Sequence, residues 1–350
     1  MKEIIKSEIK KDLLNLLKYK TIKDNFKEIN ELIEYVKKEL NNYKIKEIKV
    51  GDYKNIIISN TEDKNLDIIF CGHIDVVPCD SYEYYEKDGK VFGRGTFDMK
   101  GQVASLMSLF KFNNSKNKIA LILTSDEEIG GYCCKKIMEE YNSSLAVIPD
   151  AGKDFNLIIE EKGLLQIEIT SKGVTSHASE PYKGINPIIK LMDIYYKLIE
   201  KYNMPKDEND FKTSINLSKI NGGKANNMVP SDASMVLDIR FTKEDKPEDI
   251  INYIKNISND INIKVLDIGP VFSVNHKLKS IKKFLYDASK ILNIKIEIKK
   301  CVATSDAIYF SEKNIPAILM NPKGDYWHNP KEYVELDSLY TLYEIFKTLL

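Results

Sequence analysis

Alternating strands and helices are the feature that most restricts the fold of this chain. Three aliphatic runs are typical of buried strands: 66–71, 118–125 and 145–149. Helices are predicted to begin near Gly101 and Gly130, between these strands. Strands separated by single helices favour a mainly parallel α/β sheet. The first 60 residues are predicted to add two amphipathic helices and two short strands, at about 3–20, 24–42, 44–50 and 54–59.

A second pattern interrupts this alternation after Gly163. Four strands are predicted here, at about 164–172, 212–220, 233–241 and 261–268. Two helices, each with a proline near its start, are predicted between them at about 186–202 and 246–257. The order β-α-β-β-α-β is that of a ferredoxin-like unit. Because the α/β alternation then resumes, we predict one discontinuous domain, 1–163 and 272–350, that carries an inserted α+β domain, 164–271.

The composition limits the partners and the compartment. The 52 basic residues are balanced by 52 acidic ones, so we expect neither nucleic acid nor a membrane surface as partner. No apolar run approaches the roughly 20 residues that span a bilayer. The five cysteines are odd in number and form no CxxC pair, which argues against a disulfide framework and favours the reducing cytoplasm.

Acidic residues and histidines follow the predicted strands. His73 and Asp75 come directly after strand 66–71 and are two residues apart, so they point the same way in extended backbone. Asp98 lies in a glycine-rich segment just before a predicted helix. Taken alone, His73 with Asp75 is equally compatible with an ordinary turn, and Asp98 with a helix N-cap.

Three further segments extend this series: Asp126-Glu127-Glu128 after strand 118–125, Asp150 after strand 145–149, and His328 after a strand at 317–320. Adjacent acids behind a buried strand are costly unless cations bind there. Binding sites in open α/β sheets lie beyond the carboxyl ends of the strands. Nitrogen and oxygen ligands without sulfur suit zinc or a similar ion, and these are more than one ion needs. We therefore predict a metal pair, about 3.5–4 Å apart and bridged by one carboxylate.

With these segments in view, the sequence resembles the co-catalytic zinc family that contains succinyl-diaminopimelate desuccinylase, acetylornithine deacetylase, aminoacylase, glutamate-releasing carboxypeptidases and several dipeptidases. The matching segments run in family order from residue 72 to residue 334: GHIDVVP, GRGTFDMKG, TSDEEIGG, VIPDAG, TSHASEP, NNMVP, ATSDA and WHNPKEYV. Each segment alone is weak evidence, but all of them in order are highly specific. The resemblance implies a zinc-peptidase catalytic domain with an inserted lid and dimerisation domain.

The resemblance also assigns metal ligands position by position. His73 and Asp150 would bind the first zinc ion, and Glu128 and His328 the second, with Asp98 bridging both. Cobalt or manganese is an alternative to zinc, because mixed nitrogen and oxygen sites are not selective by sequence.

Two further carboxylates and a third histidine receive roles from the resemblance. Glu127 would be the general base, which takes a proton from water and hands it to the departing amine. Asp75 would orient His73 from its other ring nitrogen. His177, in the insert, would stabilise the oxyanion in the active site of the other subunit, which implies a homodimer. Whether His177 acts across subunits is not determined by the sequence.

Substrate contacts are also implied by the resemblance. Asn226 and Asn227 match a substrate-contacting loop, although a turn is the simpler interpretation of two asparagines beside glycines. Arg240 would bind the substrate's carboxylate with its planar fork, with a surface ion pair as the alternative. Thr304 and Ser305 match a loop near the substrate.

The resemblance therefore implies a metal-dependent hydrolase that cleaves an amide bond in a small amino-acid derivative with a free carboxylate. The length of the insert favours an N-acyl-amino-acid deacylase. Asp150 favours a dipeptidase or aminopeptidase instead. In the family, aspartate at this position is commoner in those enzymes, whereas glutamate is commoner in deacylases and carboxypeptidases. A protein that only binds amino-acid derivatives is the non-enzymatic alternative, and the intact Glu127 argues against it.

Overall fold

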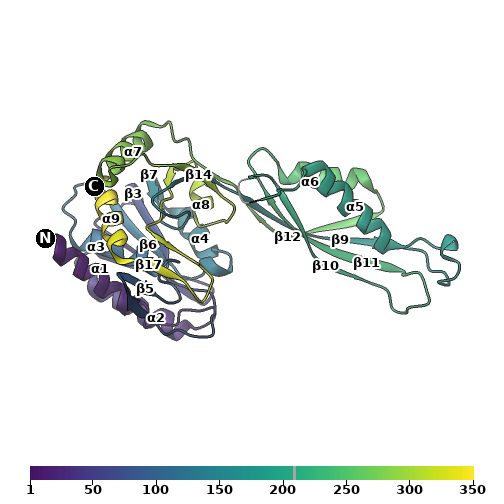
Figure 1. The fold of residues 1–350 in the computed structure, drawn as a ribbon, viewed down its shortest axis with the longest axis horizontal. Helices are drawn as coiled ribbons and strands as arrows, with labels where there is room; N and C mark the ends of the chain where they lie inside the picture. Colours follow the sequence, from purple (N-terminus) through teal and green to yellow (C-terminus); the bar gives the residue numbers. More distant parts are fainter. Residues whose placement is uncertain (208–209) are drawn as a thin grey trace. The chain divides into compact units, whose positions relative to one another are not determined.

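The computed structural model describes residues 1–207 and 210–350, and these form two compact units (Figure 1). Unit 1 comprises Met1–Glu160, Ser273–Cys301 and Ser305–Leu350. Unit 2 comprises Glu161–Phe272 together with Val302–Thr304. The chain therefore leaves unit 1, builds unit 2 and returns.

The centre of unit 1 is a six-stranded sheet. Its strands, in spatial order, are β1 (Lys44–Val50), β2 (Tyr53–Ser59), β6 (Ile119–Thr124), β3 (Asn65–His73), β7 (Asn142–Val147) and β15 (Ala317–Ile318). The four strands from β6 to β15 are parallel, and β1 and β2 add an antiparallel edge. Every residue of β6 is buried, as expected of a parallel strand covered on both faces. The predicted mainly parallel α/β sheet is confirmed.

Helices cover both faces of this sheet. They are α1 (Lys2–Leu16), α2 (Phe26–Glu39), α3 (Lys100–Lys111), α4 (Tyr132–Glu140), α7 (Lys279–Leu292), α8 (Ala307–Glu312) and α9 (Leu336–Lys347). A Cβ on Gly72 of β3 would lie 3.4 Å from Val103 of α3, whereas the neighbouring Cys71 faces Cys134 of α4. Because successive strand residues point to opposite faces, α3 and α4 lie on opposite sides of β3.

Two small sheets were not predicted from the sequence. One has the strand order β13 (Phe272–Ser273), β8 (Leu157–Glu161) and β14 (Ile298–Cys301). The other has the order β16 (Gly324–Asp325), β17 (Tyr333–Glu335), β5 (Lys90–Phe92) and β4 (Tyr85–Lys87). This second sheet pairs Tyr333 with Phe92, and so joins the segment after His328 to the segment before Asp98.

Unit 2 is a four-stranded antiparallel sheet with two helices. Its strands are β9 (Gly163–Lys172), β10 (Ser214–Gly222), β11 (Asp232–Phe241) and β12 (Ile261–Gly269), in the order β10-β11-β9-β12. Both α5 (Pro187–Tyr202) and α6 (Pro247–Ile257) lie on one side of it (Figure 1). Their leucines and isoleucines bury the alternate apolar residues of β9 and β11. This is the predicted ferredoxin-like arrangement.

Residues on the other strand face of unit 2 alternate with this core. In β9 and β11 a buried residue is followed by a partly exposed one over most of the strand length.

Within the described ranges, no helix combines the length and the apolar character that a membrane crossing requires.

Candidate metal and active site

The carboxyl end of β3 carries the most buried of the predicted ligands. His73 is the last residue of this strand and is 1% exposed. Its Nε2 lies 3.1 Å from Oδ1 of Asp98 and 3.7 Å from Oδ1 of Asp150. Asp150 follows β7, the parallel neighbour of β3, so two adjacent strand ends bring these side chains together.

Asp98 lies between two imidazoles. Its Oδ1 faces His73, and its Oδ2 lies 3.1 Å from Nε2 of His328. Met99, not Asp98, occupies the N-cap of α3, and no side chain caps that helix end. Burial alone would raise the pKa of Asp98, but hydrogen bonds from both imidazoles outweigh it and hold the pKa below its usual value. One carboxylate thus offers one oxygen to each side of the site.

His328 and Glu128 form the second side of the site. Nε2 of His328 lies 3.0 Å from Oε2 of Glu128, and hydrogen bonds to Asp98 and Glu128 raise the pKa of His328 to about 10. The other carboxylate oxygen of Glu128, Oε1, is buried and has no hydrogen-bond partner among the described residues. A buried oxygen without a partner is costly in protein and favourable as a metal ligand.

A short turn presents Glu127 and Glu128. The turn is a 3-10 helix, Glu127–Ile129, directly after β6. The Asp75 carboxylate accepts hydrogen bonds from the backbone N–H groups of Glu127 and Glu128, at 3.3 and 3.0 Å. Nδ1 of His73 lies 3.0 Å from the Asp75 carbonyl oxygen and 3.5 Å from its carboxylate. Asp75 therefore connects the β3 end to the acidic turn as well as to the imidazole.

The site holds more negative charge than its own positive groups neutralise. Two groups have ligand atoms that lie within 4.8 Å of one another: His73, Glu127 and Asp150, and His73, Asp98 and Glu128. Burial raises the pKa of Asp150 to about 6 and that of Glu127 well above its usual value. Buried carboxylates of this kind are stabilised when cations bind next to them, because an uncompensated buried charge is costly. This donor set of nitrogen and oxygen atoms fits two divalent ions.

Glu332 supports the loop that carries Asp98. Its Oε1 accepts hydrogen bonds from the backbone N–H groups of Phe97 and Asp98, at 2.9 and 3.1 Å. Its Oε2 lies 2.5 Å from Nη1 of Arg94, and both side chains are almost fully buried. Arg94 thus braces the glycine-rich loop through Glu332. Glu332 received no role from the sequence, although it lies in the same segment as His328.

Two more buried side chains, Lys100 and Tyr309, donate to backbone carbonyls and were not predicted. Lys100 is 1% exposed, and its Nζ donates to the carbonyl of Tyr19, 2.7 Å away. Tyr309 of α8 donates its hydroxyl to the carbonyl of Gly130, 2.9 Å away, directly after the acidic turn. Lysine and tyrosine are common residue types at structural positions in other proteins, so neither residue could be assigned to the site from the sequence.

In unit 2 the loops of His177 and Asn227 lie side by side. The Ala178 N–H donates to the Asn227 carbonyl at 2.9 Å, and His177 forms an isolated β-bridge with Met228. His177 is exposed, and its Nδ1 lies 2.7 Å from the Ser179 hydroxyl. Asn226 is exposed in the same turn.

The other predicted substrate residues have local partners. The Nε and Nη2 of Arg240 donate to the two oxygens of Asp238, at 2.8 and 3.3 Å. The Thr304 hydroxyl donates to the Lys162 carbonyl at 2.9 Å, and the Ser305 hydroxyl accepts from the Ala307 N–H at 3.3 Å. Their contacts with substrate remain predictions.

Comparisons with known proteins identify relatives along nearly the whole chain. A [LysW]-lysine/[LysW]-ornithine hydrolase of Saccharolobus solfataricus is 27% identical over 97% of this chain and 94% of its own. A succinyl-diaminopimelate desuccinylase of Nautilia profundicola is 26% identical over 91% of this chain and 93% of its own.

Solved structures share the fold. A tripeptidase of Staphylococcus aureus superposes with a TM-score of 0.80 at 19% identity, covering 98% of this chain and 97% of its own. A dinuclear metal-binding peptidase of Bacillus subtilis gives a TM-score of 0.73 at 16% identity, covering 99% and 97%. The sequence model of peptidase family M20/M25/M40 matches residues 69–350, which include every residue of the site. The chain therefore belongs to peptidase family M20/M25/M40 and is a metal-dependent hydrolase that acts on amide bonds.

Proposed function

We propose that this hydrolase removes the acyl group from a small N-acyl-amino acid and uses two divalent cations, preferably zinc, to do so. The position of Asp98 between His73 and His328, with one oxygen toward each, carries this proposal. The relatives support the substrate class, because their names describe the hydrolysis of succinyl-diaminopimelate and of [LysW]-lysine or [LysW]-ornithine.

The proposed ligands divide into two sets that share one carboxylate. His73 and Asp150 would hold one ion, Glu128 and His328 the other, and Asp98 both. When bound, a pair of such ions lowers the pKa of water and polarises a carbonyl group. Cobalt and manganese remain alternatives, because the donor set is not selective among these ions.

Glu127 is the proposed general base. Its carboxylate lies within the group formed with His73 and Asp150, and the two backbone bonds to Asp75 fix the turn that presents it. Burial raises its pKa, which suits a group that accepts a proton from water and returns it to the leaving amine. Asp75 is the proposed positioning residue for both His73 and this turn.

The proposed substrate contacts are in or next to unit 2. Arg240 would bind the substrate carboxylate, with Asp238 holding the guanidinium plane in a fixed orientation. Asn226, Asn227, Thr304 and Ser305 are further proposed contacts, and His177 is the proposed oxyanion donor.

A homodimer formed through unit 2 is part of the proposal. Large apolar side chains are exposed around the loop of His177: Val174, Tyr182, Ile185, Ile189 and Met228. Clustered exposed apolar residues are typical of protein interfaces. In such a dimer His177 would serve the site of the partner subunit.

A dipeptidase is the second candidate, favoured by the aspartate at position 150. The deciding experiment measures amine release from N-acetyl- and N-succinyl-amino acids and from unblocked dipeptides, with zinc or cobalt present. Turnover of the acylated compounds alone supports the deacylase, and turnover of dipeptides alone contradicts it.

The same assay tests the role of Glu127. Glu127→Ala is expected to retain both metal ions and to lose about 10²- to 10⁴-fold in kcat. The control is Glu139→Ala, at an exposed position on α4, where Glu139 forms an ion pair with Lys136 of the same helix. Unchanged turnover in Glu127→Ala would exclude Glu127 as the base, and a wild type that binds ligands without turnover would point to the non-enzymatic alternative.

A further inference from the structure

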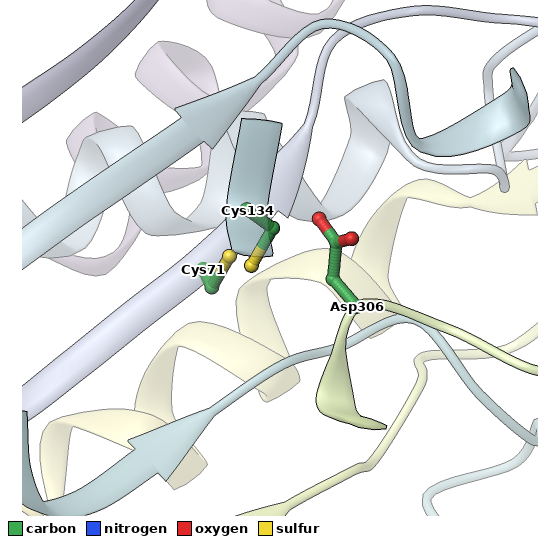
Figure 2. Close-up of side chains that lie close together, drawn as sticks. All are labelled: Cys71, Cys134 and Asp306. Atoms are coloured by element: carbon green, nitrogen blue, oxygen red, sulfur yellow. The ribbon is translucent and has the colours of Figure 1, made fainter. Parts of the chain in front are cut away.

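A second cluster of possible metal ligands lies in unit 1, apart from the nitrogen and oxygen donors described above. Cys71 of β3, Cys134 of α4 and Asp306, just before α8, place their sulfur and carboxylate oxygen atoms within 4.8 Å of one another. Figure 2 shows the two sulfur atoms next to each other, with the Asp306 carboxylate beside them. The three groups come from three separate elements.

This cluster is enclosed. Cys71 and Cys134 are 0% exposed, and Asp306 is 4% exposed. The Asp306 carboxylate accepts a hydrogen bond from the Thr124 hydroxyl at 3.1 Å. Carboxylates are rarely buried in a protein core without a charged partner or a metal ion. Apolar packing alone therefore does not account for an aspartate at this position.

We infer that Cys71, Cys134 and Asp306 bind one soft divalent cation of the Zn²⁺ or Cd²⁺ type. The ligand atoms lie within 4.8 Å of one another, which suits such an ion. A Zn–S distance of about 2.3 Å in a tetrahedral site separates two sulfur ligands by about 3.8 Å. Thiolates select soft ions over Mg²⁺ or Ca²⁺, which prefer oxygen ligands.

Charge balance also favours this assignment. A thiolate, not a thiol, is the metal ligand, so both cysteines lose their protons when a metal ion binds. Binding forms two metal–sulfur bonds, breaks two S–H bonds and releases both protons to solvent. Exchange of two protons for one dication leaves the net charge of the buried cluster unchanged. No additional charge has to be desolvated in the bound state.

The bound ion would connect elements that position the candidate active site. Cys71 precedes His73 by two residues on β3, and the two side chains point to the same face of the sheet. Asp306 packs against the turn after Glu128, since a Cβ on Gly131 would lie 2.5 Å from its Oδ1. The ion would thus hold together β3, α4 and the beginning of α8 beneath the strand ends.

Cadmium provides the test, because cadmium–thiolate bonds absorb in the ultraviolet and bonds to nitrogen or oxygen ligands do not. Cd²⁺ is titrated into the metal-free full-length protein that carries Cys79→Ser and Cys301→Ser, which removes the less buried thiols. Absorbance is followed until it is constant, and again after the protein is unfolded and refolded with Cd²⁺. We expect a thiolate band that saturates at one bis-thiolate ion per chain.

Variants distinguish the proposed ligands from other cysteines. Cys71→Ser and Cys134→Ser are each expected to lose half of the band or more, whereas Cys133→Ser, a change at the adjacent buried cysteine, is expected to keep all of it. Asp306→Asn is expected to keep the band and to weaken cadmium binding about tenfold or more. If one variant does not fold, the others still decide the assignment.

Two results would overturn the assignment. One is the absence of a thiolate band, even after refolding with Cd²⁺, in the protein that carries only Cys79→Ser and Cys301→Ser. The other is a band that Cys133→Ser reduces as much as Cys134→Ser does. Neither result depends on the proposed deacylase reaction, because the readout detects sulfur ligands and the proposed catalytic metal ions have none.

Discussion

The central sheets of the two units bury different kinds of side chain. In β9 of unit 2 buried apolar residues alternate with partly exposed ones, and among the described residues of β9 to β12 no charged side chain is fully buried. In unit 1 the sheet edge buries His73, Asp75 and Asp126 to 4% exposure or less, and Glu332 completely. Unit 2 is therefore stabilised by apolar packing, whereas unit 1 depends on ion pairs, backbone donors and bound cations to compensate its buried charges.

This difference implies that metal removal and charge substitutions change the stability of unit 1, and that apolar truncations in β9 to β12 change the stability of unit 2. Each kind of change should leave the stability of the other unit as it was. Experiments that perturb one unit can therefore test whether the two behave as separate structures.

The largest effect is expected from Asp98→Ala, which removes the carboxylate between the two imidazoles. We expect both metal sites to weaken and turnover to fall by about 10³-fold or more, since metal ions contribute several kcal/mol to such reactions. Metal analysis and turnover assays measure the two effects. Asp80→Ala, at an exposed position, is the control. Full metal content in Asp98→Ala would show that Asp98 does not bridge the ions.

Glu332→Gln is expected to destabilise unit 1 by about 3–5 kcal/mol. The substitution leaves Arg94 buried without its anionic partner, and breaking one half of a buried ion pair typically has this cost. Denaturant unfolding followed by hydrogen exchange of each unit provides the measurement. Glu335→Gln is the matched control, because Glu335 is partly exposed and lies 3.7 Å from Lys90. Equal stability of the two variants would show that the ion pair of Glu332 with Arg94 does not stabilise the site.

Leu237→Ala is expected to destabilise unit 2 by about 2–5 kcal/mol and to leave the metal content unchanged. Leu237 is 0% exposed in the core between the sheet and its helices, and its truncation creates a cavity. Val236→Ala, on the opposite face of the same strand, should cost less. Loss of metal in Leu237→Ala would show that the two units are coupled.

Removal of metal ions perturbs unit 1 and tests whether unit 2 responds. At a metal concentration 100 times the Kd, each bound ion stabilises the folded state by about 2.7 kcal/mol. A chelator should therefore increase hydrogen exchange around residues 71–75, 96–99 and 124–131, and leave strands β9 to β12 unchanged. Increased exchange in both units alike would contradict the proposed division.

Arg240→Lys is expected to have the smallest effect. Lysine keeps the positive charge but loses the planar fork, so KM for an acidic substrate should rise about tenfold, which corresponds to about 1.4 kcal/mol. A substrate whose carboxylate is replaced by an amide serves as the control and should show no such difference. If KM for both substrates changes equally, Arg240 does not bind the carboxylate.

The predictability of the fold follows the same difference between the units. All six main elements of unit 2 were predicted, since their apolar residues follow the strand and helix periods closely. In unit 1, β4, β5, β16 and β17 were missed, because they are two or three residues long and belong to one small sheet of distant segments. The first helix was predicted to reach residue 20 but ends at Leu16, and Thr21 instead donates its hydroxyl to the Ile74 carbonyl.

The candidate site could be predicted where chemistry follows a strand end. His73, Glu127, Glu128 and Asp150 have that position, and His328 lies in the segment that follows β15. Glu332, Asp306, Lys100 and Tyr309 were missed, because each acts through a contact that depends on the tertiary fold. Glu332, for example, binds backbone groups 234 and 235 residues away in sequence.

That separation has a consequence for the order in which the nascent chain acquires its structure. The five strands β1, β2, β6, β3 and β7 are complete once residue 147 has been synthesised, well before unit 2. Domains generally fold as units during synthesis. The loop of Asp98 nevertheless lacks the carboxylate that holds its N–H group until Glu332 emerges, and Asp98 itself lacks His328. Translation of nearly the whole chain therefore precedes a competent centre, so truncated products should be inert.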